Sequence, residues 1–160
     1  MVSTDMDRTG TAASTTDRIE KQVTLRASRA RVWRAVADAE EFGRWFGCRF
    51  EGQFVPGARL PGKIVDPPGY EHLHWEVLVE RVEPERVLSF RWHPGADPVP
   101  SDPMTLVTFT LEEVPEGTRL TVVESGFDAL PADRRARVFA DNEGGWQEQM
   151  GRIARHVENG

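Results

Sequence analysis

The C-terminal part of the chain carries a helical pattern of apolar residues. Within residues 142–157, four apolar side chains recur at spacings of four, three and four residues: Trp146, Met150, Ile153 and Val157. These spacings place them on one side of an α-helix, with polar residues on the opposite side. Sixteen residues at about 1.5 Å each make a rod of about 24 Å, which is long enough to cross a small domain. The pattern predicts a long amphipathic helix, preceded by a separate short helix over 132–140.

Upstream of these helices, apolar and polar residues alternate, as they do in strands with one buried face. The clearest case is 72–81, where Trp75, Val77 and Val79 share one face. Turn residues such as Pro-Gly and Glu-Pro-Glu separate this segment from its neighbours. The alternation predicts seven strands, over 18–26, 49–54, 60–65, 72–81, 86–92, 104–112 and 118–125.

Two short helices are expected between the first and second strands. Ser28 has the side chain of a helix N-cap and precedes a helix predicted over 29–37. Asp38 is expected to cap a second helix over 39–46, and Gly47 to end it, because glycine readily adopts the left-handed conformation of a helix C-terminus.

The order of elements is therefore one strand, two helices, about six strands and a long helix. Antiparallel strands with helices on one face define an α+β domain, and a sheet of long twisted strands curls around the helix that it packs against. We expect this domain to span 18–160, after a disordered tail over 1–17 that is rich in Ser, Thr, Asp and Gly. The proline-rich segment 93–103 is expected to be a loop, acting either as a lid or as a plain connection.

Composition narrows the classes of partner. The 160 residues carry a net charge of −6, which argues against a nucleic-acid surface. There is neither a run of 18 apolar residues nor the apolar core of a signal peptide, so no membrane segment is expected. A single cysteine, Cys48, forms no internal disulfide and holds no zinc or iron–sulfur cluster by itself. We expect a cytoplasmic protein without a metal or cofactor.

Few residues suggest chemistry. Strand alternation places Glu124 on the inward face, where a carboxylate needs hydrogen bonds or a countercharge. It is expected either as a polar group in an apolar pocket, or in an ion pair with an arginine or at a wet rim. His93 and Arg91 are further candidates for acid–base chemistry. His72 and His74 share a face that alternation assigns to solvent, so we expect no metal site there.

Aromatic residues are numerous, with five tryptophans and eight phenylalanines. Those predicted to point inward either line a cavity between the sheet and the long helix or fill that space as a core. If a cavity remains, the expected ligand contacts are Trp75, Val77, Phe90, Trp92, Phe109, Val122, Glu124, Trp146, Met150 and Ile153.

Several stretches together resemble a known family: 30–37 followed by Asp38, Trp45-Phe46-Gly47, 54–59, 79–92, 107–127 and Gly145-Trp146. They are similar to the Bet v 1-like, START-related helix-grip superfamily, and within it to the AHSA1-like SRPBCC branch named after the activator of Hsp90 ATPase. The resemblance covers roughly 18–158 and implies a curved antiparallel sheet around a C-terminal helix. Members of this superfamily bind lipids, hormones and polyketides, or act as cyclases.

Three functions are open, and we rank them in this order. The first is binding of a small hydrophobic or amphipathic ligand in an enclosed cavity of about 300 Å³ or more. The second is a cyclase, dehydratase or hydrolase that uses the same pocket. The third is a module that acts on an Hsp90-type chaperone. The chaperone role is ranked last because eukaryotic Hsp90 activators carry an additional N-terminal domain, whereas a short tail is expected at that place here. A homodimer is compatible with the sequence.

Overall fold

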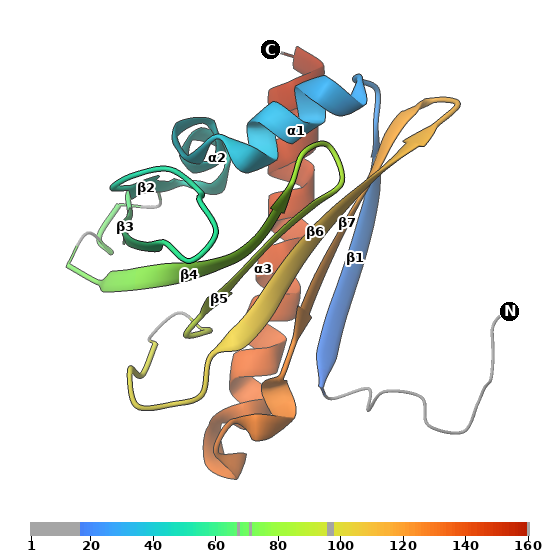
Figure 1. Cartoon of the computed structure of the whole chain (residues 1–160). Coiled ribbons are helices and arrows are strands. Elements are labelled where there is room, and N and C mark those ends of the chain that lie inside the picture. The colour runs from blue at the N-terminus through green and yellow to red at the C-terminus, as the bar shows by residue number, and fades with distance from the viewer. Residues whose placement is uncertain (1–16, 67, 71, 96–97, 160) are drawn as a thin grey trace, which may run out of the picture.

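The structure, a computed structural model, describes residues 17–66, 68–70, 72–95 and 98–159. Its elements follow the predicted order (Figure 1). They are β1 (Arg18–Leu25), α1 (Arg29–Ala37), α2 (Ala39–Phe46), β2 (Cys48–Phe50), β3 (Arg59–Ile64), β4 (His74–Glu83), β5 (Val87–Trp92), β6 (Thr105–Val114), β7 (Gly117–Ser125), the 3-10 helix η1 (Phe127–Ala129) and α3 (Ala132–Asn159). Residues 1–16 of the predicted tail lie outside the described residues.

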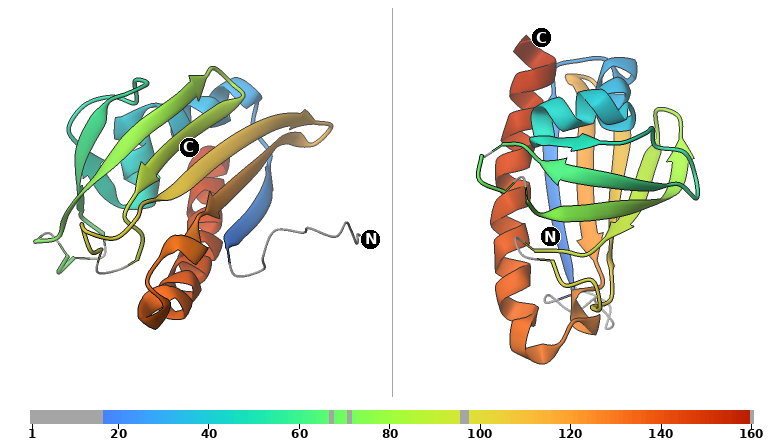
Figure 2. Two further views of the ribbon diagram at one scale, coloured as in Figure 1. Left: turned by 60° about the horizontal axis from the view of Figure 1, so that its bottom comes forward. Right: turned by 90° about the vertical axis from the view of Figure 1, so that its left-hand side faces the viewer.

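The seven strands form one antiparallel sheet in the order β1-β7-β6-β5-β4-β3-β2. The sheet curves around α3, which crosses its concave side, while α1 and α2 lie across one end (Figures 1 and 2). The predicted α+β architecture is confirmed. No helix in the described part of the chain is long and apolar enough to cross a membrane.

Strand positions match the alternation closely, with two differences. The second strand was expected over 49–54 but ends at Phe50, because Gly52 has a backbone φ of 121° that leaves the extended conformation. β4 begins at His74, and His72 lies in a turn before it. The predicted pairing of the two histidines on one strand face is therefore wrong.

The expected helix ends are confirmed by their hydrogen bonds. The Ser28 hydroxyl accepts from the Arg31 backbone N–H at 3.1 Å. The Asp38 carboxylate accepts from the Glu40 N–H at 3.4 Å. Gly47 ends α2 with a φ of 93°, and a side chain there would meet a backbone oxygen at 2.5 Å.

The C-terminal helix differs from the prediction of two helices over 132–140 and 142–157. It is continuous over Ala132–Asn159. The expected break falls at Asp141, and Gly144 and Gly145 follow it; none of these is a proline, so they lower helix propensity without removing a backbone donor. The first turns are held by packing: the rings of Phe139 and Phe127 lie 5.2 Å apart. Tertiary contact therefore extends the helix through a weak segment.

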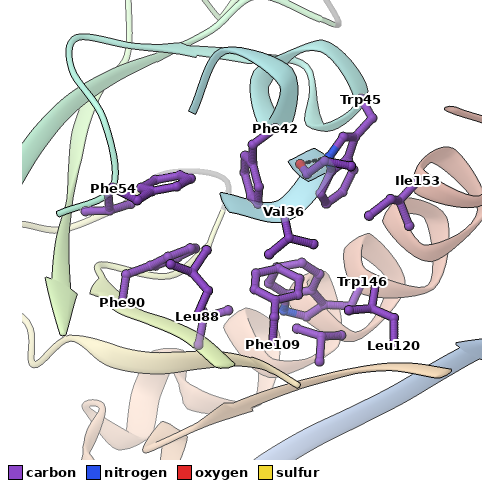
Figure 3. Packing of buried hydrophobic residues seen from close by; sticks show 14 of the residues in the cluster. Val36, Phe42, Trp45, Phe54, Leu88, Phe90, Phe109, Leu120, Trp146 and Ile153 are labelled. Carbon is purple, nitrogen blue, oxygen red and sulfur yellow. Dashed lines mark hydrogen bonds between the residues drawn. The ribbon is translucent and has the colours of Figure 1, made fainter. Parts of the chain in front are cut away.

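The middle of the space beneath α3 is filled by side chains (Figure 3). The predicted stripe on α3 is buried, and it meets large aromatic residues of the sheet and of α2. Phe42 and Phe109 are fully buried with ring centroids 5.9 Å apart. Phe109 in turn lies 5.7 Å from the ring of Trp146. In this region the filled-core alternative is the correct one.

A buried carboxylate joins the three helices. Glu41 accepts hydrogen bonds from Arg31 Nη1 at 2.5 Å and from Arg34 Nε at 3.3 Å. His156 Nε2 lies 2.9 Å from the same carboxylate. Burial alone would raise the pKa of Glu41, but the hydrogen bonds from His156 and the arginines outweigh it, and the pKa lies below the usual value. Together, the contacts of Glu41 with Arg31, Arg34 and His156 fix α1 and α2 over the C-terminal half of α3.

Candidate functional site

A cavity of about 330 Å³ lies between α3, the ends of β4 and β5, and the segment that follows β5. Its aromatic lining comes from five residues: Phe46, Tyr70, Trp75, Trp92 and Trp146. Its polar lining comes from four: His93, Asp141, Asn142 and Gln149. The remaining lining residues are Ile64, Leu73, Gly95, Pro98 and Gly145. Such an apolar cavity with a few polar groups has the character of a small-molecule site.

The aromatic rings border the cavity as one connected cluster. Trp92 and Trp146 are stacked, with centroids 5.8 Å apart and planes at 23°. Trp75 meets Trp92 edge-on at 5.7 Å and 82°. Phe46 lies 5.9 Å from the ring of Trp92 and 6.0 Å from that of Trp146. Because each ring is held by the next, the wall is rigid.

The buried carboxylate of Glu124 lies behind this wall. One of its oxygens accepts from Trp92 Nε1 at 2.8 Å and from Thr105 Oγ1 at 2.5 Å. The other accepts from Trp146 Nε1 and Asn142 Nδ2, each at 2.8 Å. These hydrogen bonds offset the cost of burying a charged group. The carboxylate thereby fixes two tryptophans that line the cavity.

The strand register and the helix period bring these donors together. Trp92 ends β5 and is paired with Thr105, which begins β6. Glu124 lies on β7, the next strand in the sheet. Asn142 and Trp146 are four residues apart on α3 and so share a helix face. Two strand ends and one helix face therefore converge on one carboxylate.

Three other residues that line the cavity carry a buried polar atom without a hydrogen-bond partner among the described residues. They are Trp75, His93 and Gln149, and the atoms are Nε1, Nδ1 and Oε1. The Gln149 amide is oriented by its nitrogen, which donates to the Phe46 carbonyl at 3.0 Å. An unpaired buried polar group is costly, so these atoms are unsatisfied polar positions on residues of the cavity wall.

The structure separates the ten predicted ligand contacts into two groups. Trp75, Trp92 and Trp146 line the cavity. The others are buried but are not lining residues: Val77, Phe90, Phe109, Val122, Glu124, Met150 and Ile153. The cavity lies nearer the end of the sheet than expected, because phenylalanines occupy its centre.

Glu124 has neither of the surroundings expected for it. Alternation correctly predicts that it points inward, and its exposed fraction is 0%. However, its partners are neutral donors instead of an arginine, and it does not line the cavity. Phe46, Asp141, Asn142 and Gln149 are among the lining residues that were not predicted from the sequence. The one available signal was that Asn142 and Gln149 lie four residues before and three residues after Trp146 on the same helix.

The remaining candidates for chemistry are dispersed. His93 lines the cavity, whereas Arg91 does not and pairs with Glu80 at 2.5 Å. Among the described residues, no group of three His, Cys, Asp or Glu side chains could hold a metal ion. Cys48 is buried, and burial raises the pKa of its thiol to about 12, although the positive charge of Arg152 lowers it in part.

A curved antiparallel sheet that grips a long C-terminal helix and leaves a cavity at one end defines a helix-grip domain. Residues 26–158 match the model of the family described as Activator of Hsp90 ATPase homolog 1-like protein. The chain belongs to this family, which confirms the predicted resemblance. No curated protein matches the chain in sequence.

Solved structures share the fold. DynU16, from the dynemicin biosynthetic locus, is 29% identical with a TM-score of 0.70; the match covers 89% of this chain but 47% of DynU16, so the chain spans about half its length. MLL2253 from Mesorhizobium loti is 23% identical with a TM-score of 0.72, covering 89% and 97% of the two chains. The Aha1 dimer from Colwellia psychrerythraea is 14% identical with a TM-score of 0.67, covering 88% and 96%.

Proposed function

We propose that the protein binds a small aromatic or amphipathic molecule in the cavity between α3 and the ends of β4 and β5. The observation that carries the proposal is the wall of connected aromatic rings around an open volume of about 330 Å³. This volume lies at the lower end of the range of about 300–1,000 Å³ that is usual for ligand sites. A compact ligand with one or two ring systems suits it.

The arrangement of the wall supports binding. Trp92 and Trp146 are held from behind by Glu124, so they lose little conformational freedom when a ligand packs against them. Trp75, His93 and Gln149 supply unpaired polar atoms among the lining residues. A ligand with both an apolar body and a polar group matches this combination.

The similarity to DynU16 favours a small organic molecule over a protein partner. DynU16 is a protein of the dynemicin biosynthetic locus, and this association supports a small organic molecule as the class of ligand. The described surface also has few large exposed apolar side chains, namely Val55 and Tyr70. A protein-docking face requires a larger apolar patch.

Two glycines on α3 allow a matched test. Gly145 lines the cavity, whereas Gly144 does not, and a Cβ added at either position meets no atom within 4 Å apart from the neighbouring helix backbone. Binding is measured by the fluorescence of N-phenyl-1-naphthylamine, a neutral probe that brightens in apolar sites. We expect Gly145→Leu to bind it about tenfold or more weakly, and Gly144→Leu to bind it like the wild type.

Both leucines raise helix propensity equally, so a difference between them reports on the cavity alone. Absence of binding to the wild-type protein contradicts the proposal. So does equal binding by the wild type and the Gly145 variant.

A further inference from the structure

Among the described residues that line the cavity, no lysine or arginine balances the acidic groups around it. Asp141 is the one formally charged residue among its described lining residues, apart from the titratable His93, and neither lysine nor arginine lines it. Asp141 is exposed on α3, at the edge of the cavity. An anionic ligand would therefore meet repulsion and no countercharge.

A second negative charge lies directly behind the aromatic wall. Glu124 is fully buried, and its four hydrogen-bond donors are two indoles, one hydroxyl and one amide, none of which carries a charge. The two indole N–H groups, one on each oxygen, can only donate, so the site suits a carboxylate, and its neutral donors supply no countercharge. In this low-dielectric surrounding the charge acts over several ångströms, and so into the cavity.

The carboxylate also acts through the rings themselves. Trp92 and Trp146 each donate an indole N–H to Glu124 at 2.8 Å. Donation to an anion polarises the indole and increases the electron density of its π system. Aromatic faces already attract cations, and tryptophan does so most strongly. The hydrogen bonds therefore strengthen an existing preference for positive charge.

The aromatic rings beside the cavity offer an extended surface to a cation. Neighbouring rings are in contact, with centroids 5.7–6.0 Å apart, so Phe46, Trp75, Trp92 and Trp146 form one continuous aromatic wall beside the cavity. A cation that lies over the face of such a ring, within about 6 Å of its centroid, is attracted to it.

From these observations we infer that the ligand is an organic cation: an amphipathic amine whose ammonium group lies in the cavity against the wall of Phe46, Trp75, Trp92 and Trp146, with Glu124 behind the wall and Asp141 at the edge. This inference rests on the proposed binding function and specifies its ligand class. It excludes carboxylates and predicts that a neutral ligand of the same shape binds less tightly.

Three probes with one aromatic body test the charge preference. They are (2-naphthylmethyl)trimethylammonium, the neutral 2-neopentylnaphthalene, in which carbon replaces the nitrogen, and 2-naphthylacetate. Equilibrium dialysis against the full chain measures the affinity of each. We expect the cation to bind about tenfold more tightly than the neutral isostere, equivalent to about 1.4 kcal/mol, and the anion to bind least. Added salt should weaken binding of the cation and leave that of the neutral probe unchanged.

The possible results separate the two proposals. If the neutral probe binds as tightly as the cation, or the anion binds more tightly than the neutral probe, the charge inference is overturned and the binding function stands. If no probe binds, both are overturned.

Two exposed acids on α3 provide matched variants. Asp141→Asn should weaken binding of the cation about threefold and leave the neutral probe unaffected, because Asp141 lines the cavity. Glu148→Gln makes the same change in net charge away from the lining. It should alter neither the affinity for the cation nor the affinity for the neutral probe. Trp75→Leu should reduce the ratio between cation and neutral affinities, with folding checked by circular dichroism. If Trp75→Leu does not fold, the comparison of Asp141→Asn with Glu148→Gln decides the test. Equal effects of these two substitutions on binding of the cation contradict the inference.

Discussion

Replacing Glu124 with glutamine changes one buried atom and tests how the cavity wall is held. Each carboxylate oxygen accepts one indole N–H: one from Trp92 and the other from Trp146. An amide has a single oxygen, and because the two indoles lie at different oxygens of the carboxylate, the amide oxygen can serve only one of them. Thr105 and Asn142 can rotate to offer an acceptor to the amide nitrogen, but an indole N–H can only donate. The indole N–H of one tryptophan therefore faces the NH2 group of the glutamine, which is also a donor.

The size of the effect follows from the one indole N–H that is left without an acceptor. A buried donor left without an acceptor costs about 1–3 kcal/mol, and removing the buried charge recovers part of it. We expect Glu124→Gln to lower the free energy of unfolding by about 2 kcal/mol. For a domain of this size, that lowers Tm by about 4–8 °C.

Urea unfolding followed by far-UV circular dichroism measures the change, because tryptophan fluorescence would itself respond to the substitution. In a Trp92→Phe protein, the amide needs to serve Trp146 alone, so the same substitution should cost at least about 1 kcal/mol less. If Glu124→Gln stays within about 0.5 kcal/mol of the wild type, or the two substitutions are additive, the argument about the two indoles is refuted.

Three further predictions concern packing elsewhere in the domain. The pKa of Glu41 is lower in the folded protein than its usual value of 4.5, so the ionised carboxylate stabilises the fold above about pH 4.5. This stabilisation is lost as the pH falls through the folded-state pKa. Glu41→Gln should thus cost about 2 kcal/mol near neutral pH and progressively less in acid; a constant difference in urea titrations contradicts this. Cys48, with its pKa raised to about 12, should resist iodoacetamide at about pH 8 until urea unfolds the protein, and rapid labelling of the native protein would show that the thiol is accessible. Gly43→Ala should destabilise by about 2 kcal/mol or more, since its Cβ would lie 2.2 Å from a backbone oxygen, whereas Gly144→Ala should stabilise by about 0.5–1 kcal/mol; thermal shifts of the same sign would contradict the packing.

Local patterns in the sequence predict the elements well. Strand alternation assigns Val77 and Glu124 to the inner face, and both are fully buried. Residues that cap helices have one local role, so Ser28 and Gly47 are identified from the neighbouring sequence alone. The helix boundary near residue 141 is predicted wrongly because its continuity depends on packing with η1, which no local pattern contains.

The site is harder to predict because it depends on volumes and on register. Whether a void remains is decided by how far the rings of Phe42, Phe90 and Phe109 fill the centre of the domain. The partners of Glu124 come from two further strands and from α3, so they are identified only when the strand pairing is known. Alternation gives the direction in which a side chain points, but not the residues that it meets.

The central claim, that the end of the sheet binds a small aromatic ligand, is tested most directly by the indole N–H signals in 1H–15N correlation spectra. The five signals belong to Trp33, Trp45, Trp75, Trp92 and Trp146, of which the last three line the cavity. Titration with 2-naphthol, a neutral soluble probe, should shift the signals of Trp75, Trp92 and Trp146. The signal of Trp45, whose N–H donates to a backbone carbonyl at 2.8 Å, and that of Trp33 should stay in place. Unchanged signals from the three cavity tryptophans, or shifts confined to the other two, would contradict the account.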